Sequence, residues 1–141
     1  MKLFLLYLIR KFGKHYKRLF SASFSYEDYF LFPFDCNQAL SKINGYIVLE
    51  NGCKIIESLN IKYVLATGTA LGIYRENDFI RNDTDLDVDL IATDLSEKHL
   101  NHLIDRFLDL GFKVGRRVTY QKKTQQLVFF DKNEVIFDMC L

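Results

Sequence analysis

Residues 62–91 read KYVLATGTALGIYRENDFIRNDTDLDVDLI, and the pattern of this stretch decides the fold. Residues 62–66 form a short apolar run typical of a strand, which leads directly into a turn at residues 67–69. A short helix is expected over residues 70–75. Residues 85–92 alternate between acidic and apolar side chains, which predicts a second strand. The stretch therefore places a glycine-containing turn beside an acidic strand.

The flanking sequence adds two helices and three strands. Residues 44–59 carry apolar side chains near the helical period, although their two glycines leave a strand around residues 46–49 as the alternative. Ser96 is expected to cap a helix over 96–110 that Gly111 ends, with His99 and His102 on its polar side. Further strands are expected at 112–120, 127–130 and 135–140, with a tight turn at 131–133 and an irregular connector at 21–34. This order predicts an α/β or α+β domain, built on a mixed sheet flanked by helices.

The acidic strand is the strongest functional signal. Successive side chains of a strand point to opposite faces, so one face carries Asp83, Asp85, Asp87 and Asp89. The other face carries Leu86, Val88 and Leu90 and is expected to lie against the core. Carboxylates stacked in this way repel one another, and strands are usually poor in aspartate. A divalent cation offsets the repulsion, so the pattern predicts a magnesium or manganese site with Asp85 and Asp87 as ligands.

Two alternative roles for the acidic strand fit its sequence less well. A solvated acidic edge would not need the strict alternation with apolar side chains. A calcium loop of the EF-hand kind needs glycine at its sixth position and glutamate at its twelfth, where this chain has Val88 and Asp94.

A second signal lies upstream, at Gly68-Thr69 and Gly72. Glycines at a passage from strand to helix let the backbone approach a phosphate, whose charge the helix N-terminus also favours. Such junctions use glycine for structural reasons as well, and that purely structural role stays open. Gly72 precedes Asp85 by only 13 residues, so phosphate donors and metal ligands are expected on adjacent elements.

Taken together, residues 62–91 resemble the signature of the LicD/fukutin-related family within the nucleotidyltransferase superfamily. The family pattern is G-T-x-L-G, then an arginine, then F-I-P-W-D-x-D-h-D. The residues that match it at the same spacings are Gly68, Thr69, Leu71, Gly72, Arg75, Phe79, Ile80, Asp83, Asp85 and Asp87. Arg81 and Asn82 stand where the family has Pro-Trp, which leaves the carboxylates in place. The resemblance implies a nucleotidyltransferase-like domain over residues 27–141.

The resemblance also implies a third carboxylate on a later strand, and Asp138 fits; a water-facing aspartate at a strand edge is the alternative. It implies transfer of a phospho-alcohol, of the phosphocholine or polyol phosphate type, from a CDP-activated donor to a cell-surface glycan. Asp85, Asp87 and Asp138 would then be catalytic and would hold magnesium or manganese. The residues implied in substrate binding are Gly68, Thr69, Gly72 and Arg75.

Two other functions remain open. One is a nucleotidyltransferase that adds NMP to a small molecule or protein. The other is a non-catalytic, membrane-associated subunit or fragment, because the chain ends three residues after Asp138, whereas the family's catalytic domains continue further. Arg116, Arg117, Lys122 and Lys123 are expected on a hairpin that either holds a phosphate or glycan or is simply solvated.

The charge distribution separates a basic head from an acidic body. Residues 1–26 carry six basic side chains and no acid, whereas residues 27–141 carry 13 basic and 18 acidic ones, a net charge of −5. An acidic body excludes general nucleic-acid binding. The apolar run at 3–9 is too short to span a bilayer, so residues 1–20 predict an amphipathic helix at an anionic membrane face, or else one packed on protein. Three widely spaced cysteines, with Cys53 and Cys140 expected in the core, indicate a reducing, cytoplasmic location.

Overall fold

The computed structural model describes residues 24–27, 39–91 and 95–141. Its elements follow the expected order, with one additional strand at the start. They are β1 (Phe24–Glu27), α2 (Lys42–Ser58), β2 (Tyr63–Leu65), α3 (Thr67–Glu76), β3 (Asp85–Leu90), α4 (Glu97–Asp109), β4 (Lys113–Tyr120), β5 (Lys123–Phe130) and β6 (Ile136–Cys140). The expected mixed α/β class is confirmed.

The strands form one six-stranded sheet in the order β1-β4-β5-β6-β3-β2. Strands β3 and β6 lie side by side near the middle and run parallel, whereas the other described pairs are antiparallel. Parallel neighbours need a long connection, which α4, β4 and β5 supply between β3 and β6. The topology therefore brings the acidic strand next to the last strand of the chain.

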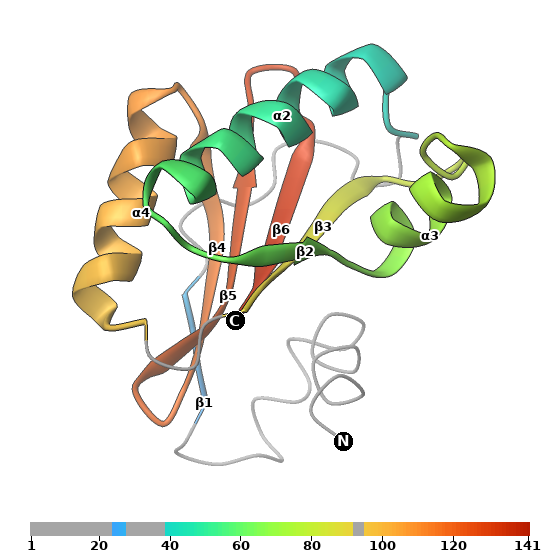
Figure 1. Ribbon diagram of the computed structural model, residues 1–141. Helices are drawn as coiled ribbons and strands as arrows, with labels where there is room; N and C mark the ends of the chain where they lie inside the picture. The colour runs from blue at the N-terminus through green and yellow to red at the C-terminus, as the bar shows by residue number, and fades with distance from the viewer. Residues whose placement is uncertain (1–23, 28–38, 92–94) are drawn as a thin grey trace.

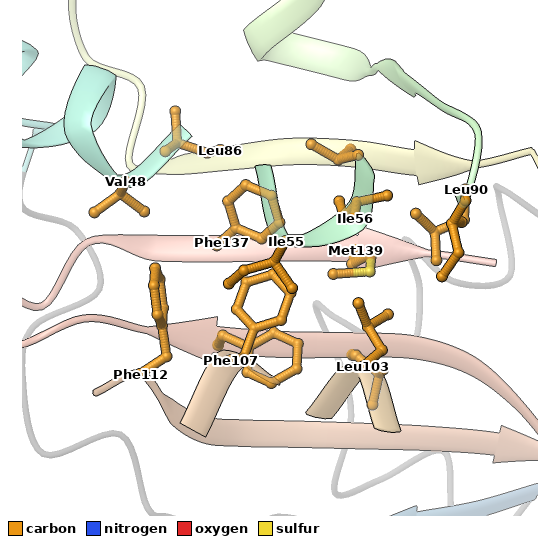
Figure 2. Packing of buried hydrophobic residues seen from close by; sticks show 14 of the residues in the cluster. Val48, Ile55, Ile56, Leu86, Leu90, Leu103, Phe107, Phe112, Phe137 and Met139 are labelled. Atoms are coloured by element: carbon orange, nitrogen blue, oxygen red, sulfur yellow. The ribbon is translucent and has the colours of Figure 1, made fainter. Parts of the chain in front are cut away.

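Helices α2 and α4 cover one face of the sheet, which we call the core face (Figure 1). Their side chains meet those of β3 and β6, as Figure 2 shows for Val48, Ile55, Ile56, Leu103, Phe107, Leu86, Phe137 and Met139. Fully burying a side chain of this kind contributes on the order of 1.5–3 kcal/mol. The expected core position of Leu86, Val88 and Leu90 is confirmed. By the alternation along a strand, the aspartates of β3 lie on the opposite face, which we call the acidic face.

The two glycines of helix α2 let it pack closely on the sheet and on the loop before β3. A Cβ atom on Gly52 would lie 2.6 Å from the ring of Phe137, and one on Gly45 would lie 2.9 Å from the ring of Phe79. The glycines that weaken the helical pattern are thus the ones that the packing requires. The expected helix is confirmed, and the alternative strand at residues 46–49 is wrong.

Helix α4 begins and ends as expected. The Ser96 side chain accepts a hydrogen bond from the backbone N–H of His99 at 3.3 Å, which caps the first turn. Gly111 follows the helix with a φ of 83°, a conformation that glycine adopts without strain. His99 and His102 are exposed, on the polar side of the helix.

Two expectations about strands are corrected. The connector at residues 21–34 is not irregular throughout, because residues 24–27 form β1, which pairs with β4 and crosses the expected boundary between residues 26 and 27. Strand β5 begins at Lys123 rather than at residue 127, because β4 and β5 continue to a two-residue turn. Both turn residues, Gln121 and Lys122, have positive φ, which matches the twist of a hairpin.

The described cysteines are also less buried than expected. Cys53 and Cys140 are half-buried rather than buried core residues. Cys140 follows the core residue Met139 on β6, so its side chain lies on the opposite face of the sheet. Burial raises the pKa of the Cys53 thiol. Asp94, Cys36 and the basic segment at residues 1–20 lie outside the described residues. Among the described residues, no helix combines the length and the apolar character needed to cross a membrane.

Candidate metal centre

Three carboxylates converge on the acidic face. Asp87 on β3 is paired with Asp138 on β6, and Asp85 lies two residues before Asp87 on the same side of the strand. One carboxylate oxygen from each of the three lies within 4.8 Å of the others. Asp83 precedes β3 and Asp89 follows Asp87 along it, and neither belongs to this cluster. We call Asp85, Asp87 and Asp138 the acidic triad.

The triad has the chemistry of a divalent cation site. The residues Asp85 and Asp138 are 5% and 4% exposed, and Asp87 is half-buried. Like charges held this close repel one another, and their removal from water adds a further cost. Clustered carboxylate oxygens are the ligands that magnesium and manganese prefer. These three residues therefore fit such an ion, which would offset both costs.

The first turn of α3 holds Asp87 from two sides. The Thr69 hydroxyl accepts a hydrogen bond from the Asp87 backbone N–H at 2.8 Å, and the Thr67 hydroxyl donates to the Asp87 carboxylate. Thr67 has a φ of 42°, a conformation that is rare for a β-branched residue and is tolerated mainly where the surroundings require it. The helix begins three residues earlier than expected, so the Thr67-Gly68-Thr69 stretch is helical rather than a loop.

Gln126 on β5 holds Asp138. Its amide Nε2 lies 2.7 Å from one carboxylate oxygen and 2.8 Å from the other, and both side chains are buried. Sequence reasoning misses this residue, because it places the start of the strand at residue 127, one position after Gln126. The signal that could have found it is a glutamine directly before the apolar run Leu-Val-Phe-Phe.

The two glycines of the motif are required by packing. A Cβ atom on Gly68 would lie 2.6 Å from the Asp83 carboxylate, and one on Gly72 would lie 2.7 Å from the backbone oxygen of Asp78. Thr69 is fully buried, with its hydroxyl turned toward β3. The role of Gly68, Thr69 and Gly72 in substrate binding stays a prediction. Gly68 and Thr69 lie in the first turn of α3, where anions are favoured, whereas Gly72 lies in the next turn.

Arg75 lies in the last turn of the same helix and is exposed. At a rise of 1.5 Å per residue, its backbone is about 12 Å along the axis from that of Thr67. The structure therefore places Arg75 and the triad at opposite ends of α3. Its role with phosphate stays a prediction.

The four basic residues of the hairpin do not gather at one place. Arg116 pairs with Val128 on β5, and Val128 pairs with Asp138 on β6. The Arg116 side chain therefore lies on the acidic face. A β-bulge between Val114 and Arg116 produces this alignment. Arg117 instead forms an ion pair with Glu97 and donates to the Thr124 hydroxyl at 3.0 Å, joining the hairpin to the start of α4.

Lys122 lies in the hairpin turn and Lys123 begins β5, and both are exposed.

On the other side of the triad, burial and then the charge of Asp87 raise the pKa of Asp89. The acidic face thus holds a strongly negative centre, with Arg116 on the same face two strands from Asp138.

Comparison with known proteins identifies the family of this chain. Residues 60–137 match the family described as "LicD/FKTN/FKRP, nucleotidyltransferase domain". The uncharacterized protein RP689 of Rickettsia prowazekii is 32% identical over 97 residues, which cover 65% of this chain and 36% of that protein. The uncharacterized protein RT0683 of Rickettsia typhi is 29% identical over 75 residues, which cover 53% of this chain and 24% of that protein. No solved structure matches.

The chain thus spans about a third or less of the length of these curated relatives. The matched range begins just before β2 and ends within β6, so it contains α3, β3 and the first two residues of the strand that carries Asp138, which itself lies one residue beyond the range. Since this range is more than half of the chain and contains two of the three carboxylates of the triad, the chain belongs to the LicD/FKTN/FKRP nucleotidyltransferase family.

Proposed function

We propose that this chain carries the centre of a metal-dependent transferase that moves a phospho-alcohol from a CDP-activated donor to a glycan hydroxyl. Family membership supports a transferase of the phosphotransferase kind. The observation that carries the proposal is the convergence of Asp85, Asp87 and Asp138 beside the first turn of α3. A metal ion held there suits a diphosphate, whose own charge the acidic face would otherwise repel.

In the proposed reaction, the acceptor hydroxyl oxygen forms a bond to the phosphorus that bears the alcohol. The bond from that phosphorus to the oxygen bridging it to CMP breaks, CMP leaves, and the hydroxyl proton is released. Asp85, Asp87 and Asp138 would hold magnesium or manganese, which supplies neutralisation of the charge on the transferring group. Asp138 would also accept the hydroxyl proton.

The other residues of the site would position the substrate. The backbone N–H groups of Gly68 and Thr69 would contact the donor phosphates at the start of α3, and Gly72 would let the helix pack against the loop at Asp78 and Ile80. Arg75 would contact the donor or acceptor at the far end of the helix. The basic segment at residues 1–20 would place the enzyme at an anionic membrane face, close to a membrane-bound glycan acceptor.

Product analysis tests the proposal. The protein is incubated with CDP-choline or a CDP-polyol and a glycan acceptor, with and without magnesium or manganese, and nucleotide products are separated by chromatography. We expect CMP release that needs the metal and that Asp87→Asn abolishes. Release of pyrophosphate from a nucleoside triphosphate would instead indicate NMP addition. Absence of both products, with the metal bound, would indicate a non-catalytic chain.

A further inference from the structure

Gln126 is a buried amide directly before the apolar half of β5. It is 8% exposed, and the residues that follow it on β5, Leu127, Val128 and Phe129, are all buried. A buried amide is costly unless its hydrogen bonds are satisfied. Its amide Nε2 donates to both oxygens of Asp138, at 2.7 and 2.8 Å, so hydrogen bonding to that carboxylate explains a buried glutamine at this position.

The contact runs diagonally across the sheet. Gln126 is paired with Cys140, and Asp138 is paired with Val128, so the glutamine side chain reaches along the strands to Asp138. Diagonal neighbours on an antiparallel pair lie within reach of long side chains. An ionised carboxylate only accepts hydrogen bonds, so the amide must present its NH₂ group and not its oxygen.

This contact restricts the terminal side-chain torsion of Asp138, which would otherwise vary widely. The terminal torsion of aspartate has a broad distribution, so the plane of an unsupported carboxylate turns easily. A donor close to both oxygens holds that plane. A carboxylate offers about four acceptor positions, so oxygen lone pairs remain for a cation while Gln126 is in place.

We propose that Gln126 is a positioning residue of the metal centre, which acts by keeping the Asp138 carboxylate in one orientation beside Asp85 and Asp87. The proposal rests on the proposed metal-dependent function. Groups that orient a metal ligand typically change metal affinity or activity by about 10–100-fold when they are removed. The Gln126 amide donates to Asp138 on the neighbouring strand, so its effect on the other two carboxylates should pass through Asp138.

Manganese binding tests the proposal, with the full chain titrated and free manganese measured by electron paramagnetic resonance. Gln126→Met keeps the length of the side chain and removes the donor. Its matched control is Gln125→Met, because the Gln125 amide donates to the backbone oxygen of Thr124 at 3.1 Å. Gln126→Asn, whose amide is too short to reach both oxygens, serves as a second variant. Circular dichroism confirms that each variant is folded.

We expect Gln126→Met and Gln126→Asn to weaken manganese binding about 10–100-fold, whereas Gln125→Met binds like the wild type. In an Asp138→Asn background, Gln126→Met should have no further effect. A folded Gln126→Met protein that binds like the wild type would overturn the positioning role and leave the metal centre standing. An equal loss of manganese affinity on Gln126→Met in the wild-type and Asp138→Asn backgrounds would also overturn the positioning role, because it indicates a general structural effect. A wild-type protein that binds no manganese would overturn the metal centre itself.

Discussion

Asp87 and Asp138 face each other across the parallel strands β3 and β6. Neighbouring strands lie about 4.8 Å apart, so two carboxylates at paired positions are forced into proximity. Like charges directly opposite each other destabilise a sheet. Two acidic residues at such positions, one of them buried, therefore do not stabilise the sheet by themselves and could hold a divalent cation.

Removal of any member of the triad should weaken metal binding. We expect Asp85→Asn, Asp87→Asn and Asp138→Asn each to reduce magnesium or manganese affinity at least about tenfold in isothermal titration calorimetry. Without metal, each variant should be as stable as the wild type or more so, because repulsion is removed. Asp89→Asn is the matched control, since Asp89 shares the strand but not the triad. Equal binding by all four variants would contradict the site.

Thr69→Val should destabilise the fold through the backbone of Asp87. The substitution preserves shape but removes the acceptor of the Asp87 N–H, and an unsatisfied buried donor costs about 1–3 kcal/mol. Urea unfolding would measure this loss. Thr67→Val is the comparison, because Thr67 is exposed and its hydroxyl bonds a carboxylate that water can also reach. A larger loss for Thr67→Val than for Thr69→Val would show that the backbone bond is the lesser contact.

Gly52→Ala should destabilise the protein although alanine is the better helix former. Alanine favours a helix by roughly 0.5–1 kcal/mol over glycine. Its Cβ would, however, lie 2.6 Å from the fully buried Phe137 ring, and overpacking of a core costs about 1–3 kcal/mol. Thermal or urea unfolding would report the net loss.

The clash itself can be tested with a second substitution. In a Phe137→Leu background the ring is absent, so Gly52→Ala should cost less there than in the wild type. An equal cost in the two backgrounds would mean that the loss of stability does not come from contact with the Phe137 ring.

The Lys42–Asp78 ion pair should make stability depend on pH. The Lys42 side chain, and then the Phe79 backbone N–H, lower the pKa of Asp78 below its ordinary value of 3.8. A lowered folded-state pKa contributes stability that is present above the unfolded value and is lost as pH falls through the folded value. Asp78→Asn should therefore lower the unfolding midpoint at pH 7 and converge with the wild type in strong acid. A difference that is constant with pH would exclude the charge as its cause.

Residues 1–20 should bind anionic membranes. Six basic and no acidic side chains lie in residues 1–26, and each basic residue near an anionic surface contributes about 1 kcal/mol. We expect co-sedimentation with vesicles that contain phosphatidylserine, weakening as salt increases, and loss of binding on deletion of residues 1–20. Manganese binding by the deletion variant should be unchanged. Equal binding to neutral vesicles would contradict an electrostatic attachment.

The sequence by itself determined the local structure and part of the site. Alternation between aspartate and apolar residues predicts β3, its buried face and the common face of Asp85 and Asp87, because the side-chain period of a strand is a local property. Ser96 and Gly111 likewise mark the ends of α4, since caps depend on the adjacent backbone.

Only the tertiary structure decided which distant residues meet. The pairing of β6 with β3 brings Asp138 beside Asp85 and Asp87, and the pairing of β5 with β6 brings Gln126 to Asp138. The pairing of β1 with β4 and the fit of Gly52 against Phe137 are likewise contacts between remote segments. Such contacts depend on strand order, which no local periodicity encodes. Gly52 is an example. It weakens the helical pattern of the sequence, and only its contact with Phe137 on β6 shows that it lets α2 approach the sheet.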